Sequence, residues 1–154
     1  MKQQNNKVKK IQFKISEIKK IEHFEKDFKE YGLKLDDLKK CKLETQVGLN
    51  IDPQKSSIAI KFSANFFFTQ GIKKINLFGI KTLHSFKIRS FNKTLAILNN
   101  NEIDLPDNFI KTLLGISISS SRGMMAVLNT NPAYQKYNIP LMNPTELIET
   151  MMKH

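Results

Sequence analysis

Apolar and polar residues alternate near the start of the chain, over residues 8–15, and this period of two predicts a half-buried strand. From residue 17 the apolar positions recur at steps of three and four, which predicts a helix over 17–31 that Gly32 ends in the left-handed conformation. The same residues also fit a strand that continues through a bulge. The apolar positions are Ile11, Phe13, Ile15, Ile18, Ile21, Phe24, Phe28 and Tyr31.

Three longer alternating stretches follow, at residues 43–51, 57–68 and 75–91. Short connections separate them, and Pro53 presets the backbone of the first connection for a turn. Because such short connections cannot cross over between parallel strands, the stretches predict an antiparallel meander. Leu83 breaks the simple alternation of the last stretch, and we therefore expect a bulge near Thr82.

The last third of the chain changes to a helical spacing. Apolar residues at steps of three and four predict a helix over 105–128, in which Asp104 caps the first turn and Pro106 fits its first positions. The middle of this segment also fits a weak helix or a strand, because Ile116 and Ile118 alternate with serines.

Small residues form a stripe on this helix, because Gly115, Ser119 and Gly123 are spaced by four. Such a stripe lets two backbones approach closely. The sequence predicts no second long helix to fill the stripe, so we expect the helix to pack on a second copy of itself about a two-fold axis.

An irregular crossover with three prolines, Pro132, Pro140 and Pro144, follows this helix. A short last helix is expected from Thr145 to about residue 152. Prolines reduce the entropy that a loop loses when it meets a partner. We therefore expect the crossover to keep its shape while it presents side chains.

The chain has 154 residues, of which 40% are hydrophobic, and this is enough for one domain with its own core. No apolar run reaches the roughly 18–20 residues that a membrane span needs, and we expect no signal peptide. Cys41 is the single cysteine, so no disulfide can form within the chain. Together these features predict a cytoplasmic protein.

The formal net charge is +11, and most of it lies near the start of the chain. Residues 1–42 hold 13 lysines against seven acidic residues. A basic surface of this kind can bind nucleic acid, acidic proteins or anionic lipid. Recognition of bases and phosphates relies mainly on arginine, whereas lysine supplies nearly all of the positive charge here. We therefore favour a solvated lysine surface over nucleic-acid binding.

Patterns for catalysis and metal binding are weak. The six glycines are isolated, and none belongs to a phosphate-binding loop. His23, His84 and His154 are far apart in the sequence, and one cysteine cannot complete a metal site with them. Cys41 with His23 or His84 is a formal nucleophile pair, but no local signature supports it. We therefore expect a protein that is not an enzyme and needs no cofactor or metal.

Aromatic residues gather in the second strand of the meander and in the crossover. Because three phenylalanines are consecutive, at least one lies on each face of the strand. Burial of both faces, in the core or in an oligomer interface, also explains them. Surfaces rich in aromatic side chains and methionine suit the binding of varied partners. The candidate binding residues are Phe66, Phe67, Phe68, Tyr134, Tyr137, Ile139 and Met142.

The order of elements and two short motifs resemble the SecB family of export chaperones and their antitoxin-associated relatives. The long helix contains the step from Ser121 to Gly123, and the crossover ends in the run from Ile139 to Pro144. The resemblance covers residues 103–148 by these motifs and the meander by the order of its elements. It implies an α+β fold, with an antiparallel meander of about four strands, a long helix, a Pro-containing crossover and a short last helix.

The resemblance also implies a function: ATP-independent holding of unfolded or pre-secretory polypeptides in exposed apolar grooves, for export or for a dedicated client such as an antitoxin. It implies a homodimer or a homotetramer. SecB itself is acidic where it docks the SecA motor, and this chain departs from that pattern, which puts SecA docking in doubt. The basic residues at this place in the meander are Lys73, Lys74, Lys81, Lys87 and Arg89.

The chain would then form one SecB-like domain over residues 1–154. It would consist of a basic extension at 1–42, the meander at 43–104 and the two helices with their crossover at 105–154. The residues leave one other interpretation open, which is an interaction or nucleic-acid-binding module that uses the basic N-terminal third.

Overall fold

The computed structural model describes residues 10–94, 96–97 and 103–152. Four strands form one antiparallel sheet in the order β1-β4-β3-β2, and β5 pairs with β6 in a small second sheet. The strands are β1 (Phe13–Glu25), β2 (Lys42–Asp52), β3 (Ser57–Gln70), β4 (Lys73–Ile88), β5 (Ala96–Ile97) and β6 (Ile103–Asp104). The helices are α1 (Phe91–Thr94), α2 (Asp107–Leu128) and α3 (Pro144–Met152), with 3-10 helices η1 (Phe28–Tyr31) and η2 (Leu35–Lys40). The α+β class expected from the sequence is confirmed.

The first strand, β1, occupies the segment where the spacing predicted a helix over residues 17–31. It pairs with β4 along its length, with register shifts between Ile15 and Glu17 and between Lys20 and Glu22. Each shift inserts one extra residue, so an apolar spacing of two becomes a spacing of three. Positions 15, 18 and 21 therefore imitate a helical period, and the alternative of a bulged strand is the correct one. Residues 8 and 9 of the expected first strand lie outside the described residues.

A short 3-10 helix, η1, is all that forms at the end of the expected helix. The Asp27 carboxylate accepts a hydrogen bond from the Lys29 N–H at its start, and Gly32 ends it at φ 72°, in the left-handed conformation that the sequence predicted. The chain then crosses from one edge of the sheet to the other, because β1 and β2 are the two edge strands. This connector buries Leu33 and Leu38 against the core.

The strands β2, β3 and β4 form the expected meander. Leu83 of β4 pairs in regular register with Lys61 of β3, and the register shift beside Thr82 comes from an extra residue of β1, so the bulge expected near Thr82 lies in the neighbouring strand and not in β4. Leu83 breaks the apolar alternation because it lies on the sheet face that α2 does not cover. The irregularity of β4 lies opposite Phe66 and Phe67 instead, where the register shifts by one residue.

The long helix, α2, begins at Asp107, with Pro106 at the N-cap position and no hydrogen bond from a capping side chain. Asp104 belongs to β6, so the expected cap is wrong. The helix continues unbroken through its serine-rich middle, which rules out the strand interpretation of that segment.

Two buried serines bring α2 close to the sheet. Ser117 and Ser121 are both fully buried on the side of the helix that faces β4, and each hydroxyl donates to the carbonyl one turn earlier. The Ser121 hydroxyl also lies 2.7 Å from Thr82 Oγ1 in a hydrogen bond. Small side chains therefore form this contact, and each of the two buried serine hydroxyls has a hydrogen-bond partner.

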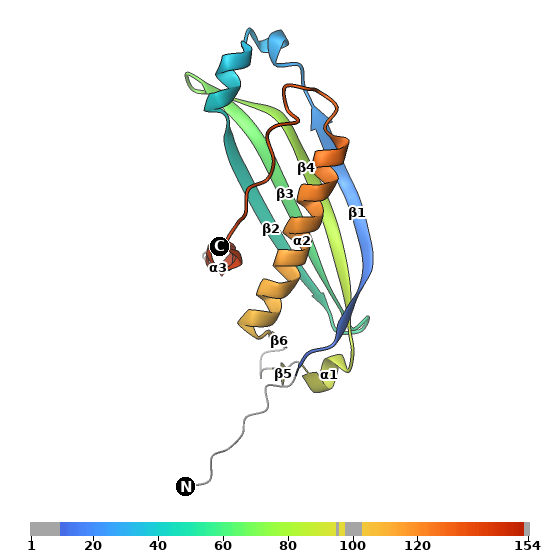
Figure 1. Ribbon diagram of the computed structural model, residues 1–154. Helices are drawn as coiled ribbons and strands as arrows, with labels where there is room; N and C mark the ends of the chain where they lie inside the picture. Colours follow the sequence, from blue (N-terminus) through green and yellow to red (C-terminus); the bar gives the residue numbers. More distant parts are fainter. Residues whose placement is uncertain (1–9, 95, 98–102, 153–154) are drawn as a thin grey trace.

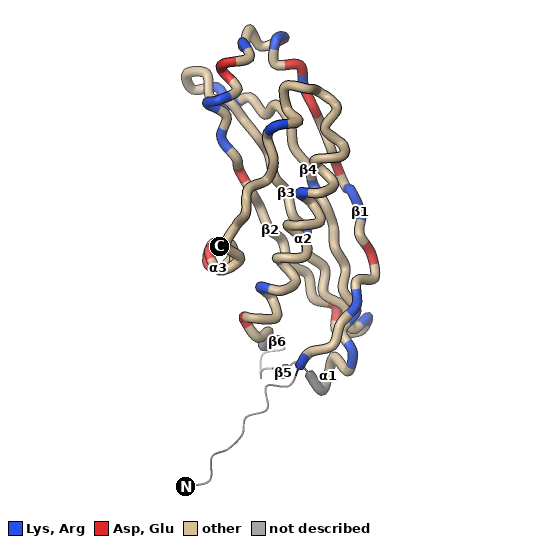
Figure 2. The backbone as a smooth tube through the Cα atoms, in the orientation of Figure 1, with Lys and Arg blue, Asp and Glu red and all other residues tan. Residues whose placement is uncertain are grey.

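The described structure has two layers, with the core between them. The sheet is one layer, and α2, the crossover and α3 lie on one of its faces (Figure 1). No helix of the described residues covers the other face. Basic residues are spread along β1, β2 and the connector, with acidic residues among them, rather than gathered at one spot (Figure 2). None of the described helices is long and apolar enough to cross a membrane.

Candidate binding surfaces

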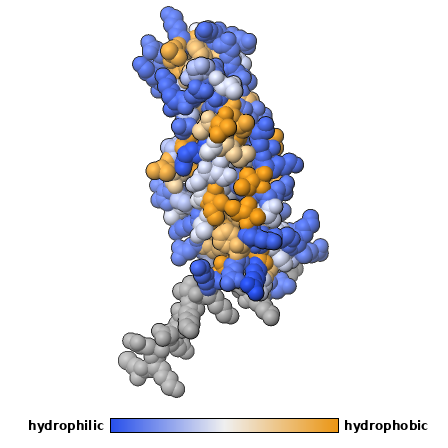
Figure 3. All heavy atoms as spheres, turned by 45° about the vertical axis from the view of Figure 1, so that its right-hand side comes forward, coloured by the Kyte–Doolittle hydropathy of each residue, from blue (hydrophilic) through white to orange (hydrophobic). Residues whose placement is uncertain are grey.

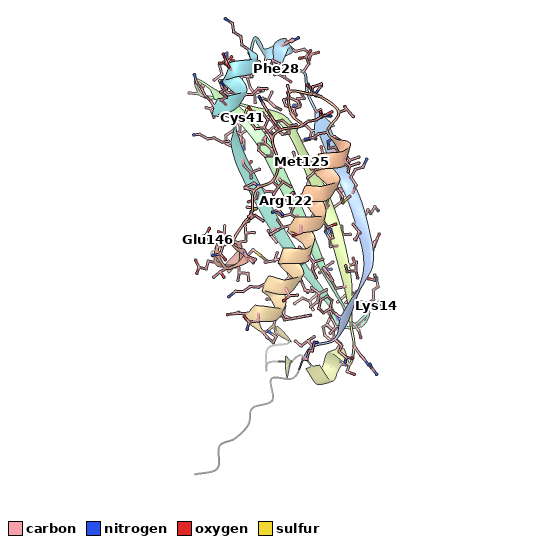
Figure 4. All side chains as sticks on the ribbon, in the orientation of Figure 1. Lys14, Phe28, Cys41, Arg122, Met125 and Glu146 are labelled. Atoms are coloured by element: carbon pink, nitrogen blue, oxygen red, sulfur yellow. The ribbon has the colours of Figure 1, made fainter. Side chains whose placement is uncertain are left out.

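The crossover, residues 129–143, is held against α2 by one arginine. Arg122 lies on the side of α2 that faces the crossover (Figure 4). Its Nε donates to the Ile139 carbonyl at 2.6 Å, and its Nη2 donates to the Pro140 carbonyl at 2.7 Å. A guanidinium offers two such donors in a fixed plane, which an ammonium cannot do. The two motifs that carried the family resemblance are therefore in direct contact.

Tyr134 anchors the crossover in the core. Its side chain is fully buried, and its ring stacks on Phe78 of β4 with the centroids 4.2 Å apart. The hydroxyl donates to the Lys26 carbonyl at 2.5 Å. Burial, followed by the negative charges of nearby groups, raises the pKa of this phenol well above its usual range. Tyr134 therefore acts as a neutral donor that ties the crossover to the end of β1.

The start of the crossover is tied to β1 by polar contacts. His23 and the side chain of Asn129 are joined by a hydrogen bond of 2.9 Å. The Glu25 carboxylate accepts hydrogen bonds from the Thr130 hydroxyl at 2.8 Å and from the Asn131 N–H at 3.1 Å. Contacts at the start, the middle and the end thus hold the crossover in one path.

Three of the seven candidate binding residues belong to the core. Phe66, Tyr134 and Ile139 are 7%, 0% and 1% exposed, so the expectation that they line an open surface is wrong for these three. Phe66 is buried because it stacks on Phe78, with the ring centroids 4.5 Å apart. Ile139 is buried at the point where Arg122 holds the chain.

The other four candidates lie at the surface, but they do not meet in one place. Phe67 is on the sheet face away from α2, with the Lys74 ammonium 4.5 Å from its ring centre. Phe68, Tyr137 and Met142 are half-buried and pack against the core on the helix side. The structure adds a residue that sequence analysis missed, Leu141, which is 91% exposed between the two prolines of the run.

We use the name crossover strip for the surface residues on the helix side of the sheet, which are Phe68, Tyr137, Leu141 and Met142. The centroid of the Tyr137 ring lies 6.1 Å from that of Phe78. Phe78 stacks on Phe66, and Phe68 is two positions further along the same face of β3. Burial, and then the nearby Cys41, raises the pKa of the Tyr137 phenol, so it stays neutral at physiological pH. The strip thus presents uncharged apolar groups on a backbone that is held in place.

The small-residue stripe of α2 faces away from the sheet. A Cβ added at Gly115 or Gly123 would meet nothing within 4 Å, and Ser119 is exposed. Contacts within the chain therefore do not need small residues at these positions. The packing of this stripe on a second copy stays a prediction.

A second apolar surface lies beside this stripe, which we call the α2–β1 strip; it consists of Ile15, Ile18, Ile116 and Val127. Ile15 and Ile18 of β1 are 45% and 48% exposed, and Val127 is 82% exposed. Phe109, which shares the flank of α2 with Ile116 and Val127, contacts Phe13 of β1 with ring centroids 5.6 Å apart. Apolar side chains gather along this side of the molecule (Figure 3).

Groups with catalytic potential are few in the described part of the chain, where no cluster of three metal-ligating side chains occurs. Burial raises the pKa of the Cys41 thiol, which disfavours the reactive thiolate. His84 is fully buried under α2, and neither ring nitrogen has a hydrogen-bond partner among the described residues. Burial lowers the pKa of His84, so its imidazole is neutral.

Comparisons with known proteins give distant likenesses of fold. No family model and no curated protein matches the chain. The chain is similar to the solved SecB-like chaperone of Mycobacterium tuberculosis in complex with an antitoxin peptide, at 10% identity and a TM-score of 0.38, over 84% of this chain and 90% of that one. It is also similar to a protein of unknown function from Streptococcus agalactiae, at 12% identity and a TM-score of 0.31, over 86% and 98%. Neither likeness carries an argument about function.

Proposed function

We propose that this protein is an ATP-independent chaperone that holds unfolded polypeptides on its crossover strip. The observation that carries the proposal is the anchored crossover, which Arg122 and Tyr134 hold in place while Leu141 extends into solvent. A side chain that is apolar, exposed and held on an ordered backbone binds a partner without a large loss of entropy.

The strip suits many weak contacts rather than one tight pocket. Burial of a client leucine or phenylalanine is worth about 1.5–3 kcal/mol before the ordering costs. Several such contacts along one client chain strengthen the overall affinity, because each bound segment raises the local concentration of the next segment. A surface of this kind selects unfolded chains, since native proteins do not expose consecutive apolar side chains. It needs no nucleotide and no cofactor.

The clients are extended apolar segments, either of pre-secretory chains or of one dedicated client such as an antitoxin. SecA is not a favoured partner, because the uncovered face of the sheet carries Lys61, Lys81 and Lys87, whereas the SecB family that the chain resembles carries acidic residues on its sheet. A cytoplasmic location fits these clients, which are unfolded where they are synthesised.

The test is the suppression of aggregation of a chemically denatured enzyme, in moderate salt and without nucleotide. The variant Tyr137→Ser/Leu141→Ser removes the two apolar tips of the crossover and should suppress aggregation much less than the wild type. The control is Ile72→Ser, which removes a fully exposed isoleucine in the turn between β3 and β4. If the crossover variant protects as well as the control does, the crossover strip is not the binding surface.

In the same proposal, the α2–β1 strip and the small-residue stripe form a contact between copies, and the protein is a homodimer or homotetramer. Gly115→Leu tests this contact cleanly, because a side chain there meets nothing within its own chain. It should reduce the mass measured by light scattering, whereas Glu149→Leu on α3 should not. A wild type that is monomeric at working concentration would rule out the contact.

A further inference from the structure

The face of the sheet away from α2 is hollowed at its centre. Cross-strand pairing places one residue from each strand in a single row, namely Lys19, Leu83, Lys61 and Gly48. The neighbouring position on β3 is Ala59, so two small residues lie beside the lysines. Together with Ile21 of β1, they line an open trough of about 720 Å³. The trough has an apolar floor because Leu83, Ala59 and Gly48 form its centre.

The lysines of this trough differ from those elsewhere on the same face. Lys74 is paired with Glu44 at 2.5 Å, and Lys81 approaches Glu22 at 3.9 Å. Lys19 and Lys61 make no ion pair with any described residue, and the trough has a third lysine, Lys20, and no carboxylate in its lining. Two ammonium groups therefore flank an apolar floor, and no carboxylate lines the trough between them.

The geometry points to a partner: we infer that this trough docks an acidic polypeptide segment with an apolar residue between its carboxylates. Lys19 and Lys61 are two strands apart, which corresponds to about 10 Å at the usual strand spacing. In an extended segment, carboxylates four residues apart lie on the same side, about 13 Å from each other, and the flexible stems of the two lysines can span the difference; the residue midway between the carboxylates points to that side too. An aliphatic side chain between them would then lie over Leu83. The inference concerns a surface separate from the crossover strip and does not depend on the chaperone proposal.

A polypeptide fits this face better than a nucleic acid does. The four strands of the sheet contain no arginine, although guanidinium groups are the usual readers of phosphates. Glu17, Glu22 and Glu44 are interleaved with the lysines and would repel a continuous phosphate backbone. A hollow with an apolar floor also favours a protruding side chain over the flat surface of an anionic membrane.

The test uses the full chain and a labelled eight-residue peptide with two glutamates four positions apart and a leucine midway between them. Its counterpart has glutamines in place of the glutamates. The wild type should bind the acidic peptide more tightly than the glutamine peptide, and Lys19→Glu/Lys61→Glu should weaken that binding about tenfold or more. The control, Lys29→Glu/Lys40→Glu, makes the same change of net charge in the connector between β1 and β2 and should leave binding near the wild-type value.

A second variant keeps the test decisive if the charge reversal harms folding. Gly48→Val fills the trough without changing any charge, and a Cβ there meets only Lys61 Cβ, at 3.7 Å. It should also weaken the acidic peptide. Equal binding of both peptides by the wild type, or no loss in the trough variants, would overturn the inference. Tighter binding of a DNA duplex or of anionic vesicles, lost in the same variants, would assign the trough to those ligands instead.

Discussion

Replacement of Arg122 by methionine is the sharpest perturbation of the anchored crossover. The change keeps a long apolar stem and removes the fork that donates to the carbonyls of Ile139 and Pro140. A hydrogen bond to a charged group contributes about 1.5–3 kcal/mol, and the exposed bond to Pro140 contributes less than the part-buried one. The buried Ile139 would also lose the partner of its carbonyl. We expect the free energy of unfolding to fall by about 2–4 kcal/mol.

The assay is urea unfolding followed by far-ultraviolet circular dichroism at a fixed protomer concentration. Arg122→Lys is the matched control, because an ammonium can reach one carbonyl but cannot bridge both. It should lie between the wild type and Arg122→Met. Hydrogen exchange should show faster exchange in residues 137–143 of the methionine variant. If Arg122→Met unfolds within about 0.5 kcal/mol of the wild type, the arginine does not hold the crossover.

Three further predictions concern single buried groups. Burial lowers the pKa of His84 below its ordinary value of 6.5, so on acidification the unfolded chain binds the proton before the folded chain does. The free energy of unfolding should therefore fall as the pH drops below about 6.5, by at most about 1.4 kcal/mol per pH unit. His84→Leu should reduce this slope in urea midpoints measured from pH 5 to 7.5; an unchanged slope would contradict it. Tyr134→Phe removes the hydrogen bond to the Lys26 carbonyl and should lower the free energy of unfolding in urea by about 1 kcal/mol. An unchanged value would show that this hydrogen bond does not stabilise the fold. Gly79→Ala places a Cβ 2.6 Å from the Ala64 carbonyl oxygen and should lower the free energy of unfolding in urea by about 1–3 kcal/mol. An unchanged free energy of unfolding would mean that β3 and β4 move apart at this point without strain.

The architecture could be predicted wherever one residue period ran without interruption. The regular alternation of β2 and β3 and the long apolar ladder of α2 led to elements close to those observed. The sequence did not decide whether the β1 segment is a strand or a helix, because two bulges convert its apolar spacing of two into a spacing of three. Only the pairing with β4, which is a contact distant in sequence, decides between the two interpretations.

The candidate site was harder to predict, because residue type does not determine burial. Tyr134 and Tyr137 are three residues apart in the same crossover, but only the first reaches a backbone acceptor, the Lys26 carbonyl, and becomes core. Leu141 lies one position from Met142 and is far more exposed, since the path of the chain is set by Arg122. The sequence contains both sides of these contacts, but not the geometry that pairs them.

The measurement that tests the proposed function most directly compares the affinity of the wild type for the unfolded and the native form of one client. Fluorescence anisotropy of a labelled client, held unfolded by a destabilising substitution, gives both values in moderate salt without nucleotide. A holding chaperone should bind the unfolded form at least about tenfold more tightly, and Tyr137→Ser/Leu141→Ser should remove most of that preference. Equal affinity of the wild type for the two forms would contradict the proposed function.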